Sequence, residues 1–180
     1  LLHQKILFCF AFYLTLLIGY NTIVQKEFVY SWIKQKAYWE NVVKLCPDID
    51  SNTVIISEID NNFTFGTSFI NILSPQSNKW ILGSFYSFPF GQKFINLFSV
   101  YSGWENNVEK LNDKYILKNT VQIDTLKDFN VIYLKMDREF NISRINSTIS
   151  IMGKPLKLKS NIENTVSKFE KSKLYNLMIE

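Results

Sequence analysis

Four acidic side chains flank one short hydrophobic segment, and they are the clearest concentration of chemically active groups in the chain. Asp48 and Asp50 precede the segment Thr53–Ile59, and Glu58 and Asp60 lie at its far end. As a strand, this segment would span roughly 23 Å, so the two pairs would not meet across one active site. Asp60 follows a buried strand, where α/β proteins often bind ligands. The alternative, which we favour, is that all four are turn or solvated-edge residues.

Other patterns that carry catalysis or bind cofactors are missing from the sequence. His3 is the only histidine, and Cys9 and Cys46 lie far apart, so the chain lacks a zinc-ligand cluster, a histidine-based nucleophile and an expected disulfide. The glycine-rich loops GxGxxG and GxxxxGK[ST] are also absent. The net charge of +4 is modest and the later lysines are spaced, which argues against nucleic acid. We expect no metal, no cofactor and no catalytic residue that the sequence alone can name.

The N-terminal segment is apolar and long enough to cross a bilayer. No charged residue occurs from Ile6 to Gln25, and Lys5 and Lys26 flank the gap. As a helix, these residues would extend about 30 Å, the thickness of the hydrocarbon core. We predict a transmembrane helix within residues 1–25. A cleaved signal peptide and a buried core helix are the alternatives; the first lacks a good cleavage site, and the second should be apolar on one face only.

The flanking charges bear on orientation, and the first residue bears on the length of the parent protein. Lys5 precedes the apolar segment, and Lys26 and Glu27 follow it. By the positive-inside rule we interpret the N-terminal side as cytoplasmic, because Glu27 contributes little to the rule and His3 is mostly neutral. The chain starts at Leu1, at the edge of the apolar run. We therefore expect a C-terminal piece of a longer polypeptide whose last membrane helix is this one.

The rest of the chain predicts an α+β (mixed α/β) soluble domain over residues 26–160, preceded by the one transmembrane helix. Apolar residues at helical spacing predict a helix over Val24–Cys46, ended by Pro47 and continuous with or next to the first. The β-branched segments Thr53–Ile59 and Asn130–Met136 predict buried strands, which we expect to be neighbours in one sheet.

The remaining segments give shorter predictions. Residues Gln92–Val100 predict a short helix, and Trp104–Leu117 a hairpin that turns at Asn112-Asp113. A second hairpin is expected over residues 148–159, turning at Met152-Gly153-Lys154. The polar tail, residues 161–180, has a faint helical stripe.

One stretch resembles known proteins. The string WENVVKLCPDIDSNTVIISEID, which begins at Trp39, is similar to the C-terminal region of large multi-spanning bacterial membrane proteins, and the strings beginning at Gly103 and Gly153 look similar in kind. Some of that group are described as glycosyltransferase-like proteins of the lipid-linked-sugar type. Their catalytic carboxylate lies in an early extracytoplasmic loop, outside this chain, so the resemblance assigns no catalytic residue here.

The resemblance implies a domain accessory to glycosyl transfer from a lipid-linked sugar, on the extracytoplasmic side of the bacterial inner membrane. Its expected partners are the lipid bilayer and a lipid-linked sugar or envelope glycan. The candidate binding residues are four aromatic sugar-stacking platforms and one carboxylate: Trp80, Phe85, Tyr86, Trp104 and Asp60. A ring of this kind must be exposed to solvent beside polar groups. The alternative function is a non-enzymatic, membrane-anchored structural or interaction module.

Overall fold

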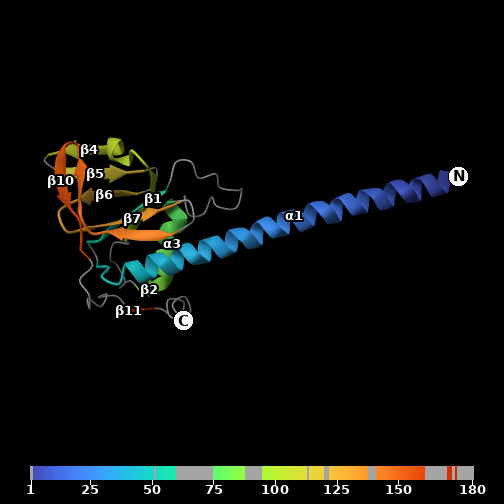
Figure 1. Ribbon diagram of the computed structural model, residues 1–180, viewed down its shortest axis with the longest axis horizontal. Helices are drawn as coiled ribbons and strands as arrows, with labels where there is room; N and C mark the ends of the chain where they lie inside the picture. The colour runs from blue at the N-terminus through green and yellow to red at the C-terminus, as the bar shows by residue number, and fades with distance from the viewer. Residues whose placement is uncertain are drawn as a thin grey trace.

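A long N-terminal helix leads into a sheet-rich domain (Figure 1). The computed structural model describes residues 2–50, 52–59, 75–87, 95–112, 114–119, 122–137, 141–160, 170, 171 and 173. Within these residues the helical elements are α1 (Leu2–Leu45), α3 (Pro75–Phe85) and the 3₁₀ helix η1 (Trp104–Asn107). The strands are β1 (Val54–Ile59), β2 (Tyr86–Ser87), β3 (Asn96–Tyr101), β4 (Val108–Leu111), β5 (Lys114–Lys118), β6 (Ile123–Leu126), β7 (Val131–Met136), β8 (Ile142–Ile145), β9 (Thr148–Ile151), β10 (Lys154–Lys157) and β11 (Glu170–Lys171).

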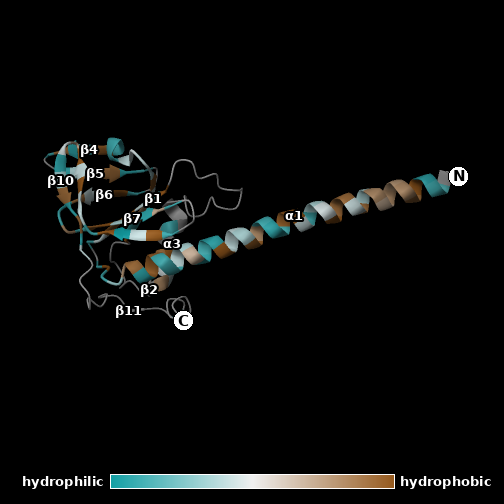
Figure 2. Ribbon diagram, viewed as in Figure 1, coloured by the Kyte–Doolittle hydropathy of each residue, from teal (hydrophilic) through white to brown (hydrophobic). Residues whose placement is uncertain are grey.

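The two expected N-terminal helices are one continuous helix, α1, whose 44 residues extend about 66 Å. It ends at Leu45, directly before the Cys46-Pro47 turn, as the proline predicts. Within the part of the chain that the structure describes, α1 is the only helix long and apolar enough to cross a membrane, and the domain leaves its apolar stretch uncovered. Figure 2 shows hydrophobic residues along this uncovered stretch. The described residues therefore include one candidate membrane span, followed without a break by the domain.

The centre of the domain is a mixed four-stranded sheet in the order β3-β1-β7-β8. Strands β3, β1 and β7 run parallel, and β8 is antiparallel to β7. Ile56 of β1 lies between Phe98 of β3 and Tyr133 of β7. The two predicted buried strands are thus confirmed, and they are direct neighbours.

The prediction of a short helix over Gln92–Val100 is wrong where the structure describes it, because Asn96–Tyr101 is strand β3. Leu97 packs on one side of the sheet and Phe98 on the other, so this short apolar run is buried on both faces. Periodicity alone does not separate a buried strand from a helix in such a run.

Two hydrophobic cores lie on opposite faces of the central sheet. On one face the end of α1 and helix α3 pack through Tyr38, Val42 and Leu82 against alternate residues of the sheet. On the other face the three-stranded sheet β4-β5-β6 and the β9-β10 hairpin complete the second core. The domain is therefore α+β, with helices, a mixed sheet and antiparallel strands in successive layers (Figure 1).

Both predicted hairpins are present, but the first begins at Val108, because Trp104–Asn107 is the 3₁₀ helix η1. Strands β4 and β5 pair antiparallel on either side of Asn112, and β9 and β10 pair on either side of Met152-Gly153, whose φ angles are +51° and +77°. Helix α3 and strands β6 and β8 were not predicted. Residues 161–169 of the tail lie outside the described residues, and Glu170–Lys171 pairs with β2.

Candidate functional site

The structure separates the acidic candidates, as the length of the strand predicts. Asp48 and Asp50 lie before the amino end of β1, whereas Glu58 lies near its carboxyl end. Asp60 is outside the described residues. Asp48 lies in the turn that follows α1, as predicted, but Asp48 and Glu58 are each only 5% exposed, so the interpretation of Glu58 as a solvated-edge residue is wrong. A buried carboxylate requires a cation or hydrogen-bond donors, so each of the two must have such partners close to it in the folded structure.

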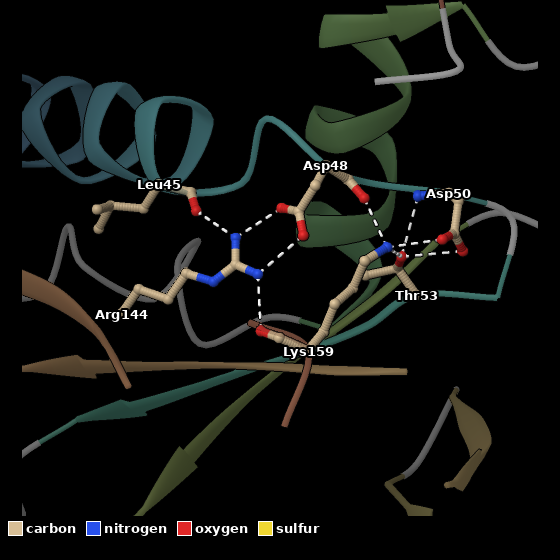
Figure 3. Close-up of polar contacts among 6 residues, drawn as sticks. All are labelled: Leu45, Asp48, Asp50, Thr53, Arg144 and Lys159. Carbon is tan, nitrogen blue, oxygen red and sulfur yellow. Dashed lines mark hydrogen bonds and ion pairs between the residues drawn. The ribbon is translucent and has the colours of Figure 1, made fainter. Parts of the chain in front are cut away.

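Asp48 is held by a buried arginine (Figure 3). Both terminal nitrogens of Arg144, on β8, donate to the two oxygens of the Asp48 carboxylate, at 2.6 and 2.9 Å. The same nitrogens donate to the backbone carbonyls of Leu45 and Lys159, each at 2.8 Å. The carbonyl of Leu45 is one of those at the end of α1 that lack a partner within the helix. Arg144 therefore ties the end of α1 to β8 and to the segment after β10.

Lys159 completes this cluster from the side (Figure 3). Its Nζ donates to the backbone carbonyl of Asp48 and to the Asp50 carboxylate, both at 2.6 Å. Burial of Asp50 raises the pKa of its carboxyl, but hydrogen bonds from Lys159 and the Asn52 backbone outweigh burial, so that pKa lies below its usual value. We call Asp48, Asp50, Arg144 and Lys159 the helix clasp. Its charges are paired with each other, and the Arg144–Asp48 pair is buried, so its role is structural.

Glu58 is the centre of a second polar cluster, at the carboxyl edge of the parallel strands. Its carboxylate accepts hydrogen bonds from the Tyr133 hydroxyl and, at 2.9 Å, from the Ser102 hydroxyl. The Lys135 ammonium lies 3.6 Å away. Burial of Tyr133, together with its hydrogen bond to Glu58, raises the pKa of the phenol well above its usual value. Tyr133 therefore stays protonated and continues to donate to Glu58 at neutral pH.

Ser102 connects this cluster to a pocket of about 550 Å³. The pocket is formed by the end of β3, the 3₁₀ helix η1 and the β4-β5 hairpin. Gly103 makes the turn between β3 and η1 with a φ of +87°, which a side chain rarely allows. The described polar and charged groups that line the pocket include Ser102, Asn106, Asn107, Glu109, Lys118 and Asn119.

The charges in this lining are balanced. Glu109 and Lys118 are the charged residues among those described along the pocket, and they pair at 2.5 Å. Glu58 is not among the lining residues, but its carboxylate accepts the hydrogen bond of the Ser102 hydroxyl and so orients that side chain. The pocket thus presents amides and hydroxyl groups without a net charge. Such a lining suits a polar, uncharged ligand.

Of the predicted aromatic platforms whose side chains the structure describes, Trp104 lines this pocket and Phe85 does not. Phe85 is 3% exposed and packs on Trp39, and Trp104 is 2% exposed and packs on Tyr133, so neither ring is a platform. A large ring contributes most to stability when buried, which explains this outcome. The side chains of Trp80 and Tyr86 lie outside the described residues.

Tyr101, which was not among the predicted binding residues, lines the pocket and is 44% exposed beside Ser102 and Asn106. The signal for it was faint: Tyr101 ends a strand and is followed by Ser102-Gly103, a pair of turn residues. Arg144 had a clearer signal, as an arginine between two isoleucines in a strand-like segment, Ile142–Ile145.

A second pocket, of about 500 Å³, is lined by Asp50, Asp124 and Asp128 at the opposite edge of the sheet. These carboxylates accept protein hydrogen bonds: Asp124 from Asn96, and Asp128 from the backbone of Lys157. Within the described ranges, His, Cys, Asp and Glu form no group of three able to hold a metal ion. The pocket beside Glu58 is therefore the better candidate for binding.

Comparisons with known proteins found no match to this chain among protein-family models, curated proteins or solved structures. The resemblance to membrane glycosyltransferase-like proteins accordingly stays a prediction.

Proposed function

We propose that this chain is a membrane-anchored, non-catalytic domain that binds a glycan in the pocket beside Glu58. The observation that carries the proposal is the combination of a half-exposed ring, Tyr101, with the amides of Asn106 and Asn107 around one pocket. An aromatic face packs on the apolar face of a sugar ring, while amides and hydroxyl groups donate to and accept from sugar hydroxyl groups. This is the arrangement of exposed ring and polar neighbours that a sugar platform requires.

The charge of the pocket limits the chemical class of ligand that it would bind. Because Glu109 and Lys118 neutralise each other, the lining favours an uncharged sugar over a phosphate or a carboxylate. The proposed ligand is therefore the sugar part of a lipid-linked sugar, or an envelope glycan, and the domain is accessory to glycosyl transfer by the parent protein. A transferase would supply its catalytic carboxylate from elsewhere.

The proposed location is a bacterial inner membrane, with α1 as the anchor. The apolar stretch of α1 supports anchoring. That the domain lies on the extracytoplasmic side is a prediction that depends on Lys5, the charge that precedes the apolar segment. When the positive-inside rule is applied to the whole of α1, Lys26, Lys34 and Lys36 favour a cytoplasmic domain instead. Labelling of a Leu111→Cys variant with a membrane-impermeant maleimide in intact spheroplasts decides between the two sides.

Glycan binding is tested with the full chain in nanodiscs of phosphatidylethanolamine and phosphatidylglycerol, because glycoside detergents would compete for the pocket. Binding to an array of bacterial envelope oligosaccharides is measured first, and the best oligosaccharide is then titrated by calorimetry. Tyr101→Ala should weaken binding roughly tenfold, or about 1.4 kcal/mol.

The matched control is Phe129→Ala, which removes an exposed ring, 61% accessible, that does not line this pocket. Binding should be unchanged in this variant. Equal losses in both variants would contradict the proposed site. A folded, membrane-embedded chain that binds no oligosaccharide would leave the alternative, a non-enzymatic structural or interaction module.

A further inference from the structure

A group of large apolar side chains stands exposed on α1 just before the helix enters the domain. We call it the interfacial collar; its members are each between 56% and 67% exposed, and they are Phe28, Val29, Tyr30, Trp32 and Ile33. They lie beyond Lys26, outside the charge-free segment. Exposed rings in such number on one short stretch of helix are costly in water, so the collar requires a non-aqueous neighbour.

One face of the helix is buried from this level onward. Ser31 is 4% exposed and accepts a hydrogen bond from Gln35 at 2.9 Å. Tyr38 and Val42 lie seven and eleven residues after Ser31, so all three share one face of the helix, and all three are buried. The collar residues occupy the other faces. The described core contacts of α1 begin at Tyr38, five residues after Ile33, with no linker between the collar and the domain, since α1 continues unbroken to Leu45.

The length of the exposed apolar stretch identifies the neighbour. The charge-free stretch from Ile6 to Gln25 extends about 30 Å, which matches the hydrocarbon core, so the collar begins where a headgroup layer begins. Tyr and Trp concentrate in the headgroup layer, where the ring is buried and the polar atom stays wet. The long stem of Lys26 allows its ammonium to reach the same layer. Lipid headgroups thus suit the collar better than a protein partner.

We propose that the interfacial collar lies in the headgroup layer, so that the domain rests directly on the membrane surface. This inference depends on the membrane anchoring in the proposed function but not on glycan binding. Because α1 is a single helix from the span into the core, the domain cannot lift away from the bilayer without breaking the packing of Tyr38 and Val42.

The depth of the collar is measured with spin labels on the full chain in vesicles of phosphatidylethanolamine and phosphatidylglycerol. Native Cys9, exposed on α1, is the marker for the hydrocarbon core. Cys46 is fully buried, and burial raises the pKa of its thiol to about 12, so it does not react with the label. In a Cys9→Ser background, Trp32→Cys reports on the collar, and Leu111→Cys, at an exposed hairpin tip, is the aqueous marker.

Accessibility to oxygen and to a polar nickel chelate is then compared at the three sites. The label at Trp32→Cys should give nickel accessibility between those of Cys9 and Leu111→Cys, and Tyr30→Cys, on another face of the helix, should agree. Nickel accessibility equal to that at Leu111→Cys would overturn the inference while Cys9 still reads as buried in lipid. Low accessibility to both reagents would also overturn it, because protein, such as a second copy, would then cover the collar. Water-like accessibility at Cys9 would refute the anchoring itself.

Discussion

The substitution Asp48→Asn should destabilise the domain strongly, although Asp48 lies in a proline turn. It removes the charge that faces Arg144 and leaves the size of the side chain almost unchanged. The side chains of Arg144 and Asp48 are only 3% and 2% exposed, so water cannot replace the lost partner. Removal of one member of a buried ion pair costs about 3–5 kcal/mol, because the other charge is left uncompensated. A domain has about 5–15 kcal/mol of total stability, so this loss is a large part of it.

The loss is measured by urea unfolding of the full chain in nanodiscs, followed by tryptophan fluorescence. Trp39 and Trp104 are buried in the two cores on opposite faces of the sheet, so one transition reported by both would show that the domain unfolds as a unit. With a slope of roughly 2 kcal/mol per molar urea, the midpoint should fall by about 1.5–2.5 M.

Glu109→Gln is the matched control, because it makes the same chemical change in an exposed ion pair. Glu109 and Lys118 lie 2.5 Å apart, with side chains 57% and 50% exposed. Such pairs contribute about 0–1 kcal/mol, so the midpoint should fall by less than about 0.5 M. In the double variant Asp48→Asn with Arg144→Gln, the loss should be smaller than the sum of the single losses. Equal midpoints for Asp48→Asn and Glu109→Gln would refute the buried helix clasp.

Three further predictions concern pH, the core and the membrane span. Burial raises the pKa of Cys46 from 9.0 to about 12, so its contribution to stability is complete below pH 9 and is lost as the pH rises toward 12; urea midpoints should fall above pH 9, and less steeply in Cys46→Ala. Ile56→Asp puts a charge at a fully buried position and should cost more than about 4 kcal/mol, seen as lost protection of the central sheet in hydrogen exchange, whereas Ile123→Asp, at an exposed site, should keep that protection. Lysines in place of Leu14 and Leu17 should weaken insertion by roughly 2.5–3.5 kcal/mol each and make the chain extractable by carbonate; retention in the membrane pellet would count against α1 as the span.

The burial of Asp48 and Glu58 could not be predicted from the sequence. Asp48 follows a proline and precedes Asp50, Ser51 and Asn52, which is the composition of an exposed turn. Its partner, Arg144, is 96 residues away in the sequence, and no local pattern joins them. Glu58 likewise looked like the solvated end of a strand until Tyr133 and Ser102 were brought against it. Whether a carboxylate is buried depends on residues that only folding places around it.

The features that the sequence determined by itself are those that depend on neighbouring residues. A charge-free apolar run sets the candidate span, Pro47 ends the helix, β-branched runs make β1 and β7, and Gly153 allows the tight turn of a hairpin. Each of these follows from solvation or backbone sterics over a few residues.

The tertiary structure alone decided the pairing of distant groups. It made Asn96–Tyr101 a strand, because a place beside β1 buries both of its faces, and it made Phe85 and Trp104 core residues in place of platforms. It also placed the β4-β5 hairpin beside Tyr101 and the asparagines of η1 to form the pocket, and left Ser31 buried while the neighbouring rings stayed exposed. These outcomes depend on contacts between segments far apart in the chain, whose formation is governed by the packing of the whole domain and leaves no periodic trace in the sequence.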